Sequence, residues 1–135
     1  MSENTGDLLM STARALRRQD LAALAEWDIT PSQSRALRIV CELESARISV
    51  LADRLHIAPR SATEVVDALE SRGLVTRTED PADRRAICVL PTQQGASLRR
   101  VMDQTRRAAT EEFLAVLSEA DRRDLARILA TLVSE

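Results

Sequence analysis

Apolar residues recur every three or four positions over most of the chain, which is the spacing of amphipathic helices. The first such stretch covers residues 7–27, and the second covers residues 31–43. The second has a clear start, because Thr30 can cap a helix, Pro31 suits its first position and Gln33 stands three residues after the cap. The pattern therefore predicts two helices in the first third of the chain.

Two shorter apolar stretches follow at close spacing. Ser49 is a candidate cap for a short helix that ends near Ile57. Pro59 then opens a helix that runs to Arg72, and Gly73 can adopt the left-handed conformation that ends a helix. Two helices separated by about three residues have the spacing of a helix-turn-helix motif.

The next apolar residues follow a different pattern. Runs of β-branched and apolar residues at 74–79 and 86–90 flank a polar segment, 80–85, which predicts a β-hairpin. After the hairpin, Thr92 can cap a long helix, and Ser118 can cap a last one.

The expected fold is mainly α with a small β-hairpin wing. A winged helix-turn-helix head at residues 44–91 lies within a helical frame made of residues 1–43 and 92–135, and the whole chain forms a single domain.

Composition supports this fold and excludes several classes of protein. The chain has 135 residues, of which 44% are hydrophobic and 30% charged, as in a soluble globular domain. The longest uncharged stretch, residues 86–98, is shorter than the roughly 20 apolar residues of a membrane-spanning helix. Because Glu3 and Asp7 stand where a signal peptide carries positive charge, we expect a cytoplasmic protein with reduced thiols.

The helix predicted to follow Pro59 has a polar outward face. Its apolar stripe, residues 62, 65, 66 and 69, turns Arg60 and Glu64 outward and leaves Ser61 and Thr63 on the flanks. A helix that reads the major groove of DNA needs such side chains, because they reach base edges and phosphates. An ordinary solvated helix face has the same pattern, so the helix alone does not decide the function.

The predicted hairpin tip carries a second group of polar residues. Arg84 and Arg85 stand at the end of a protruding ribbon, where an arginine can enter a narrow minor groove. Asp83 is too acidic to face DNA, so we expect it to pair with a neighbouring arginine and fix the shape of the tip. A tight turn with incidental charges is the alternative.

These segments together resemble the MarR family of bacterial winged-helix regulators. The resemblance rests on Leu69-Glu70 through Gly73-Leu74-Val75, on Arg77, on the Asp83-Arg84-Arg85 run, and on Thr92 with Gly95. It implies that Ser61 and Thr63 contact DNA and that Arg85 enters the minor groove. Two positions depart from the family pattern: Ala58 replaces a common Ser or Thr cap, and Glu64 replaces a common Arg.

The resemblance also implies a homodimer that presents two heads to an inverted-repeat operator in double-stranded DNA. The sequence fits this independently, because a head of about 50 residues offers little core to three amphipathic helices. The expected interface residues are apolar and lie in the frame: Leu9, Leu16, Phe113, Leu117, Leu125, Leu129 and Leu132. Packing of the frame within a monomer is the alternative.

The remaining reactive residues predict no catalysis. His56 lacks partners at metal-ligand spacing, and no catalytic motif or phosphate loop is present, so we expect no enzyme, no metal and no cofactor. Cys41 and Cys88 are expected to be buried small hydrophobic residues. The resemblance adds a small aromatic or anionic effector, for which Trp27, Arg38 and His56 are candidate pocket residues.

The sequence thus predicts a homodimeric, sequence-specific DNA-binding regulator, a repressor that an effector releases. The alternative is a winged-helix module that docks on another regulator without gripping DNA. The net charge of −2 supports this alternative, as do the outward Glu64 and Asp67.

Overall fold

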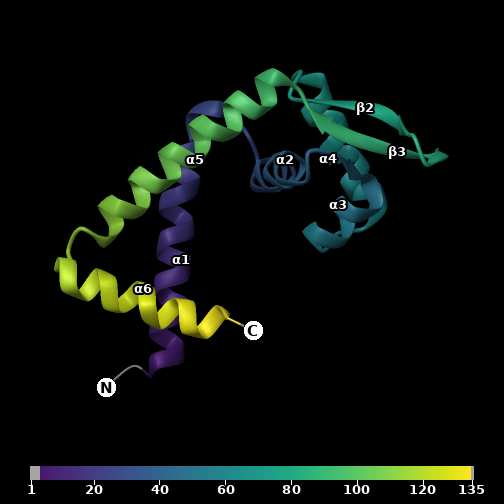
Figure 1. Cartoon of the computed structure of the whole chain (residues 1–135). Coiled ribbons are helices and arrows are strands. Elements are labelled where there is room, and N and C mark those ends of the chain that lie inside the picture. The colour runs from purple at the N-terminus through teal and green to yellow at the C-terminus, as the bar shows by residue number, and fades with distance from the viewer. Residues whose placement is uncertain (1–3, 135) are drawn as a thin grey trace. The chain divides into compact units, whose positions relative to one another are not determined.

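The computed structural model describes residues 4–134 (Figure 1). In chain order the elements are α1 (Thr5–Leu24), the 3-10 helix η1 (Ala25–Trp27), α2 (Pro31–Leu43), β1 (Ala46–Arg47), α3 (Ile48–Leu55), α4 (Pro59–Ser71), β2 (Val75–Asp80), β3 (Asp83–Pro91), α5 (Gln93–Leu114) and α6 (Glu119–Val133). The predicted fold class, mainly helical with a small β wing, is confirmed.

The chain divides into two compact units. One consists of residues 24–104, and the other combines the residues up to 23 with those from 105 onwards. The first unit is larger than the expected head, 44–91, because α2 packs against α3 and α4. α5 contributes residues to both units.

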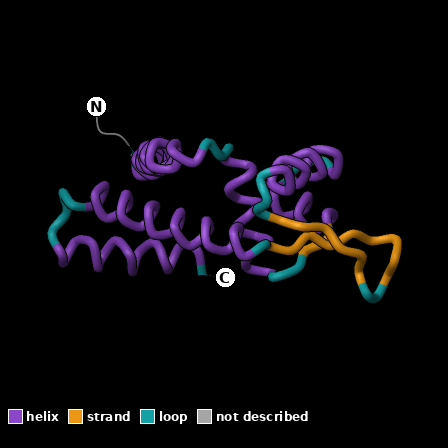
Figure 2. Tube along the Cα trace, turned by 90° about the horizontal axis from the view of Figure 1, so that it is seen from above, coloured by secondary structure: helices purple, strands orange, loops and turns teal. Residues whose placement is uncertain are grey.

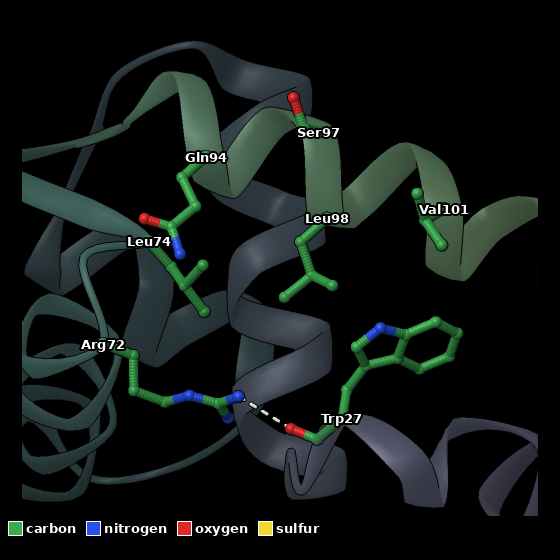
Figure 3. A pocket seen from close by; sticks show the side chains of 7 residues that line it. All are labelled: Trp27, Arg72, Leu74, Gln94, Ser97, Leu98 and Val101. Atoms are coloured by element: carbon green, nitrogen blue, oxygen red, sulfur yellow. Dashed lines mark hydrogen bonds between the residues drawn. The ribbon is translucent and has the colours of Figure 1, made fainter.

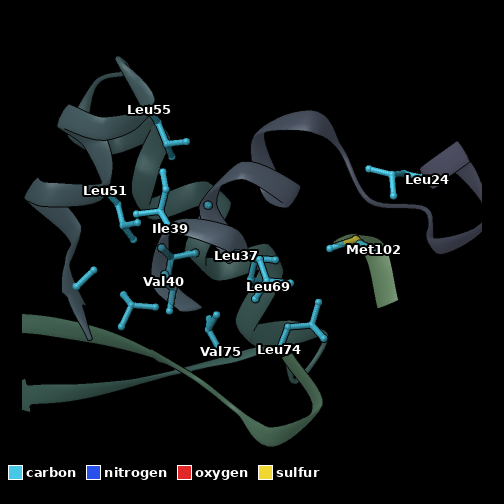
Figure 4. Close-up of a cluster of buried hydrophobic side chains, with 14 residues drawn as sticks. Leu24, Leu37, Ile39, Val40, Leu51, Leu55, Leu69, Leu74, Val75 and Met102 are labelled. Atoms are coloured by element: carbon cyan, nitrogen blue, oxygen red, sulfur yellow. The ribbon is translucent and has the colours of Figure 1, made fainter. Parts of the chain in front are cut away.

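The core of the unit formed by residues 24–104 is apolar (Figure 4). Its fully buried large side chains are Leu37, Val40, Leu51, Val66, Leu69, Leu74, Val75 and Val89. They come from α2, α3, α4 and the sheet, so each of these elements turns one face inward. The stripe predicted along α4 is the buried face of that helix, with Val65 partly buried and Ala62, Val66 and Leu69 buried.

Three of the predicted helix starts have the expected caps, at Thr30, Thr92 and Ser118. The Thr30 hydroxyl accepts a hydrogen bond from the Gln33 backbone N–H at 3.1 Å, and the Gln33 side chain accepts one from the Thr30 backbone. The Ser118 hydroxyl accepts from the Asp121 backbone N–H. The Ser49 cap is wrong: α3 begins at Ile48, directly after β1, and has no side-chain cap, because Arg47 leaves the strand straight into the helix.

The sheet has three antiparallel strands in the order β1-β3-β2. The pairing of β2 with β3 runs from Val75 opposite Pro91 to Asp80 opposite Asp83. This hairpin extends beyond the helices of its unit (Figures 1 and 2). β1, which pairs with Val89 and Cys88 of β3, was not expected, because two residues are too few to leave a pattern in the sequence.

Two glycines allow the chain to pass closely between α4 and α5. Gly73 has a φ of 74° and follows the end of α4, as predicted. At Gly95, an added Cβ would lie 1.9 Å from the Leu74 carbonyl oxygen, so no other residue fits without a shift of the backbone. Thr92 completes the junction, since its hydroxyl donates to the Gly73 carbonyl at 2.6 Å and accepts from the Gly95 N–H at 3.0 Å.

Three helices end on a left-handed residue that is not glycine. Asp28 follows η1 with a φ of 48°, Glu44 follows α2 with a φ of 64°, and His56 follows α3 with a φ of 56°. Side chains disfavour this conformation, so each of these helix ends is locally strained.

Candidate nucleic-acid interface

α3 and α4 form the two helices of a helix-turn-helix motif. Three residues, 56–58, connect them, and the backbone N–H of Ile57 donates to the Ala52 carbonyl at 3.0 Å. Leu51 and Leu55 of α3 and Leu69 of α4 are buried, so both helices pack on a common core. The packing fixes which side of α4 remains in contact with solvent.

The side of α4 that remains free carries the predicted polar residues. Arg60 and Glu64 are exposed, while Ser61 and Thr63 are half-buried on the flanks. The Thr63 hydroxyl donates to the Pro59 carbonyl at 3.1 Å, which leaves its oxygen lone pairs as acceptors. Within residues 4–134, Arg60 forms no ion pair, so its guanidinium remains available to an external anion.

The wing turn is tighter than the sequence suggested. β2 extends to Asp80 and β3 begins at Asp83, so only Pro81 and Ala82 lie in the turn. Arg84 and Arg85 therefore belong to β3 instead of the loop tip. They lie where the register of the hairpin shifts, and both are exposed without an ion pair among the described residues.

Two aspartates shape this turn. Asp83 accepts a hydrogen bond from the Arg85 backbone N–H at 3.0 Å, whereas the sequence suggested a pairing with an arginine side chain. Asp80 accepts from the Ala82 backbone N–H at 2.9 Å and pairs with Arg47 of β1 at 2.6 Å. These two partners of the Asp80 carboxylate, the Ala82 N–H first and Arg47 second, hold its pKa below the ordinary value.

A second set of ion pairs joins the wing to α4. Arg77 of β2 places Nη2 2.5 Å from Asp67 Oδ1 and Nη1 2.6 Å from Glu70 Oε1. Sequence reasoning missed this contact, although an arginine beside a helix with two acids three positions apart was a usable signal. The outward charge of Asp67 is therefore partnered.

A pocket of about 360 Å³ lies in the same unit, lined by Trp27, Arg72, Leu74, Gln94, Ser97, Leu98 and Val101 (Figure 3). Arg72 bridges its edge, donating to the Trp27 carbonyl at 2.7 Å and to the Asp28 carbonyl at 3.0 Å. The structure does not bring the three candidate effector residues together. Trp27 lines this pocket, the exposed His56 lies in a separate depression with Val50, Asp53 and Arg54, and Arg38 lines neither.

The cysteines have the surroundings of packing residues. Cys88 is buried in β3, and Cys41 is half-buried in α2, where burial raises the pKa of its thiol. Among residues 4–134, no group of His, Cys, Asp and Glu has the geometry of a metal site. No helix in the described part is long and apolar enough to cross a membrane.

The second unit has very little core of its own. Of its described residues only Ala109 is buried, and α6 buries none. The predicted interface residues divide into two groups: Leu9, Leu129 and Leu132 are exposed, whereas Leu16, Phe113, Leu117 and Leu125 are half-buried.

The helix-turn-helix and the adjacent hairpin define a winged helix-turn-helix protein. The MarR family model matches residues 29–87. An uncharacterised HTH-type transcriptional regulator of Mycobacterium leprae is 31% identical over 94% of this chain and 85% of its own length. An HTH-type transcriptional repressor of Mycobacterium tuberculosis is 27% identical over 96% of this chain and 94% of its own length.

Solved structures agree with this assignment. MarR of E. coli superposes with a TM-score of 0.90 at 22% identity, covering 99% of both chains, and it has also been solved with operator DNA. The M. tuberculosis protein, solved with p-aminosalicylic acid, superposes with a TM-score of 0.79 at 26% identity over 98% of this chain and all of that one. The chain belongs to the MarR family of transcription regulators, which confirms the expected family and the expectation that it is not an enzyme.

Proposed function

We propose that this protein is a homodimeric, sequence-specific DNA-binding regulator that represses genes from palindromic operators and is released by a small-molecule effector. One observation carries the proposal: the exposed polar half of α4 and the unpaired arginines of the wing belong to the same compact unit. A winged helix-turn-helix needs both elements, one for each groove of the duplex.

Each proposed contact has a chemical basis. Arg60 can donate two hydrogen bonds to a guanine, Ser61 and Thr63 reach base edges or phosphates, and Glu64 can accept from a cytosine amine. Arg84 and Arg85 project from the wing toward the minor groove, whose negative potential attracts guanidinium. The solved complex of E. coli MarR with operator DNA supports this mode for the fold.

Homodimer formation is supported by the exposed apolar residues of the second unit. They lie on α1, α6 and the turn before α6: Leu8, Leu9, Met10, Leu21, Val116, Ile128, Leu129, Leu132 and Val133. Helices with so few buried residues are not stable alone in water. The frame, residues 1–43 and 92–135, would bury this surface against a second copy of the chain.

The proposed effector site is the pocket beside Trp27. The indole and the aliphatic side chains suit an aromatic ring, and Arg72 provides a cation at the edge. The structure of the M. tuberculosis relative with p-aminosalicylic acid, an aromatic anion, supports this ligand class. An effector changes DNA binding only if it binds one arrangement of the two heads better than the other.

Selection of random duplex DNA on the purified protein tests the proposal. We expect an enriched inverted repeat with half-site centres about 34 Å apart, one turn of the double helix. If no sequence is enriched by a protein that is folded and dimeric, the proposal of specific readout is wrong.

A salt titration separates this function from a module that docks on another protein. DNA affinity should fall by about 0.9 log units per log unit of salt for each phosphate contacted. Weak DNA association that does not respond to salt would instead favour protein docking.

A further inference from the structure

Besides Glu64, the proposed DNA-reading helix carries two further exposed carboxylates, Asp67 and Glu70. Thr63, Asp67 and Glu70 follow one another at intervals of four and three, so they lie along one line of α4. The side chains of Asp67 and Glu70 are 61% and 43% exposed. In a helix that approaches DNA along this line, two bare carboxylates would repel the phosphates.

The guanidinium of Arg77 covers both charges. It reaches Asp67 Oδ1 with Nη2 at 2.5 Å and Glu70 Oε1 with Nη1 at 2.6 Å, and its own side chain is only 23% exposed. Its planar fork holds two carboxylates at once, which the single ammonium of a lysine does with less fixed geometry. Both pairs form without DNA, so the charges are already compensated before any encounter.

We propose that Arg77 is a positioning residue that masks Asp67 and Glu70 of α4 and thereby permits DNA binding without touching DNA itself. This inference rests on the proposed function, because it assigns a role within the same interface. The inference also explains how a head with a slight excess of acidic residues could bind DNA. Residues 44–91 contain seven arginines and eight acids. Arg77 alone neutralises much of the charge of two of these acids.

The test measures the affinity of the full-length dimer for the duplex selected on wild type, by fluorescence anisotropy over a range of salt concentrations. The variants are Arg77→Gln, Asp67→Asn with Glu70→Gln, and the three substitutions together. Arg77→Gln should weaken binding about tenfold or more, because it uncovers both carboxylates. The triple variant should return to within about threefold of wild type, and the pair of acid substitutions should bind at least as tightly as wild type.

Arg99→Gln is the matched control. Arg99 also faces two carboxylates, Asp103 at 2.6 Å and Glu42 at 3.6 Å, and its side chain is 26% exposed. The substitution removes the same charge from α5 instead of the wing. We expect operator affinity to change less than about threefold, which would show that net charge alone does not explain the effect of Arg77.

Three results would overturn the inference. If Arg77→Gln leaves affinity unchanged, no masking is needed. If the triple variant stays weak and its salt slope is shallower by about 0.9, Arg77 contacts a phosphate directly. If the acid substitutions alone weaken binding more than about tenfold, the carboxylates themselves serve the interface.

Folding of each variant is checked by its melting temperature. If Arg77→Gln does not fold, the triple variant and the acid pair still test the inference, because in both of them the carboxylates of Asp67 and Glu70 have been replaced by amides. Failure of wild type to bind any duplex would overturn both this inference and the proposed function, whereas the results above overturn the inference alone.

Discussion

At the scale of single residues, the arginines of the wing have different environments and therefore different expected roles. Arg85 is exposed and has no ion pair among the described residues, whereas Arg47 and Arg77 are held by carboxylates. An unpaired guanidinium loses no protein partner when it binds a phosphate or a base edge. Arg85 is thus suited to contact DNA, and the paired arginines are suited to hold the wing.

Substitution of Arg85 by alanine should therefore weaken operator binding without affecting the fold. We expect a loss of about tenfold, concentrated at A·T-rich flanks, because a narrow minor groove attracts guanidinium most strongly there. Anisotropy measurements on duplexes with A·T-rich and G·C-rich flanks check this. An equal loss on both duplexes would indicate a phosphate contact outside the minor groove.

Gly95 has a structural role that can be tested separately. In Gly95→Ala the new Cβ would lie 1.9 Å from the Leu74 carbonyl oxygen, so α5 or the start of β2 must move. We expect the free energy of unfolding to fall by about 3 kcal/mol, on the scale of overpacked sites. Denaturant unfolding measures this. Gly6→Ala in the exposed first turn of α1 is the control, and it should leave stability unchanged or slightly raised.

At the scale of elements, Asp80 organises the wing by joining the turn to β1. Its carboxylate holds the Ala82 N–H and the Arg47 side chain, and both lower its pKa. A carboxylate whose pKa is lower in the folded state stabilises the fold above its ordinary pKa of about 3.9. This stabilisation is lost as the pH falls below that value and through the folded-state pKa.

The pH dependence of Asp80→Asn follows from this. At pH 7 the variant should melt at a lower temperature than wild type, and the difference should shrink to near zero as the pH falls well below about 4. Arg47→Gln removes the same pair from the other side and should behave similarly. Thermal melts at several pH values check both variants. A difference that persists at the lowest pH would assign the effect to the shape of the amide instead of to charge.

The elements that could be predicted from sequence are those with a local signal. The capping box at Thr30, the left-handed Gly73 and the buried stripe along α4 are set by neighbouring residues, so sequence reasoning found them. The pairing of β1 with β3 depends on residues about 40 positions apart. A strand of two residues is too short to produce a recognisable sequence pattern.

The candidate site was predictable to a similar extent. The polar face of α4 followed from helical periodicity, but the boundary of the wing turn did not, because the register shift beside Asp80 admits extra residues into β3. The pocket was only partly predicted. Trp27 lines the same pocket as Gln94 and Ser97 because of the tertiary fold, and no spacing along the chain indicates this.

At the scale of the whole molecule, the two compact units have different numbers of buried residues. The unit formed by residues 24–104 has a continuous apolar core, whereas the described part of the other buries only Ala109. In the proposed homodimer the terminal helices would be stabilised by a second copy of the chain, so the melting temperature should rise with protein concentration.

Leu132→Glu tests this dependence. Leu132 is 65% exposed on α6, and a charge there should shift the protein from dimer to monomer, because the carboxylate would be buried without a partner. Sedimentation velocity measures the change. Arg127→Gln, which alters the charge equally on the opposite side of α6, is the control and should remain dimeric. A dimeric Leu132→Glu protein would move the interface away from the end of α6.

The left-handed helix ends are positions at which a substitution could raise the stability of the protein. Glu44 has a conformation that glycine adopts freely, so Glu44→Gly relieves a strain of about 1 kcal/mol, less the chain entropy that glycine adds. The position lies between α2 and β1, so it belongs neither to α4 nor to the hairpin that carries the wing arginines. A background strengthened in this way would keep weakened interface variants folded long enough for their binding to be measured.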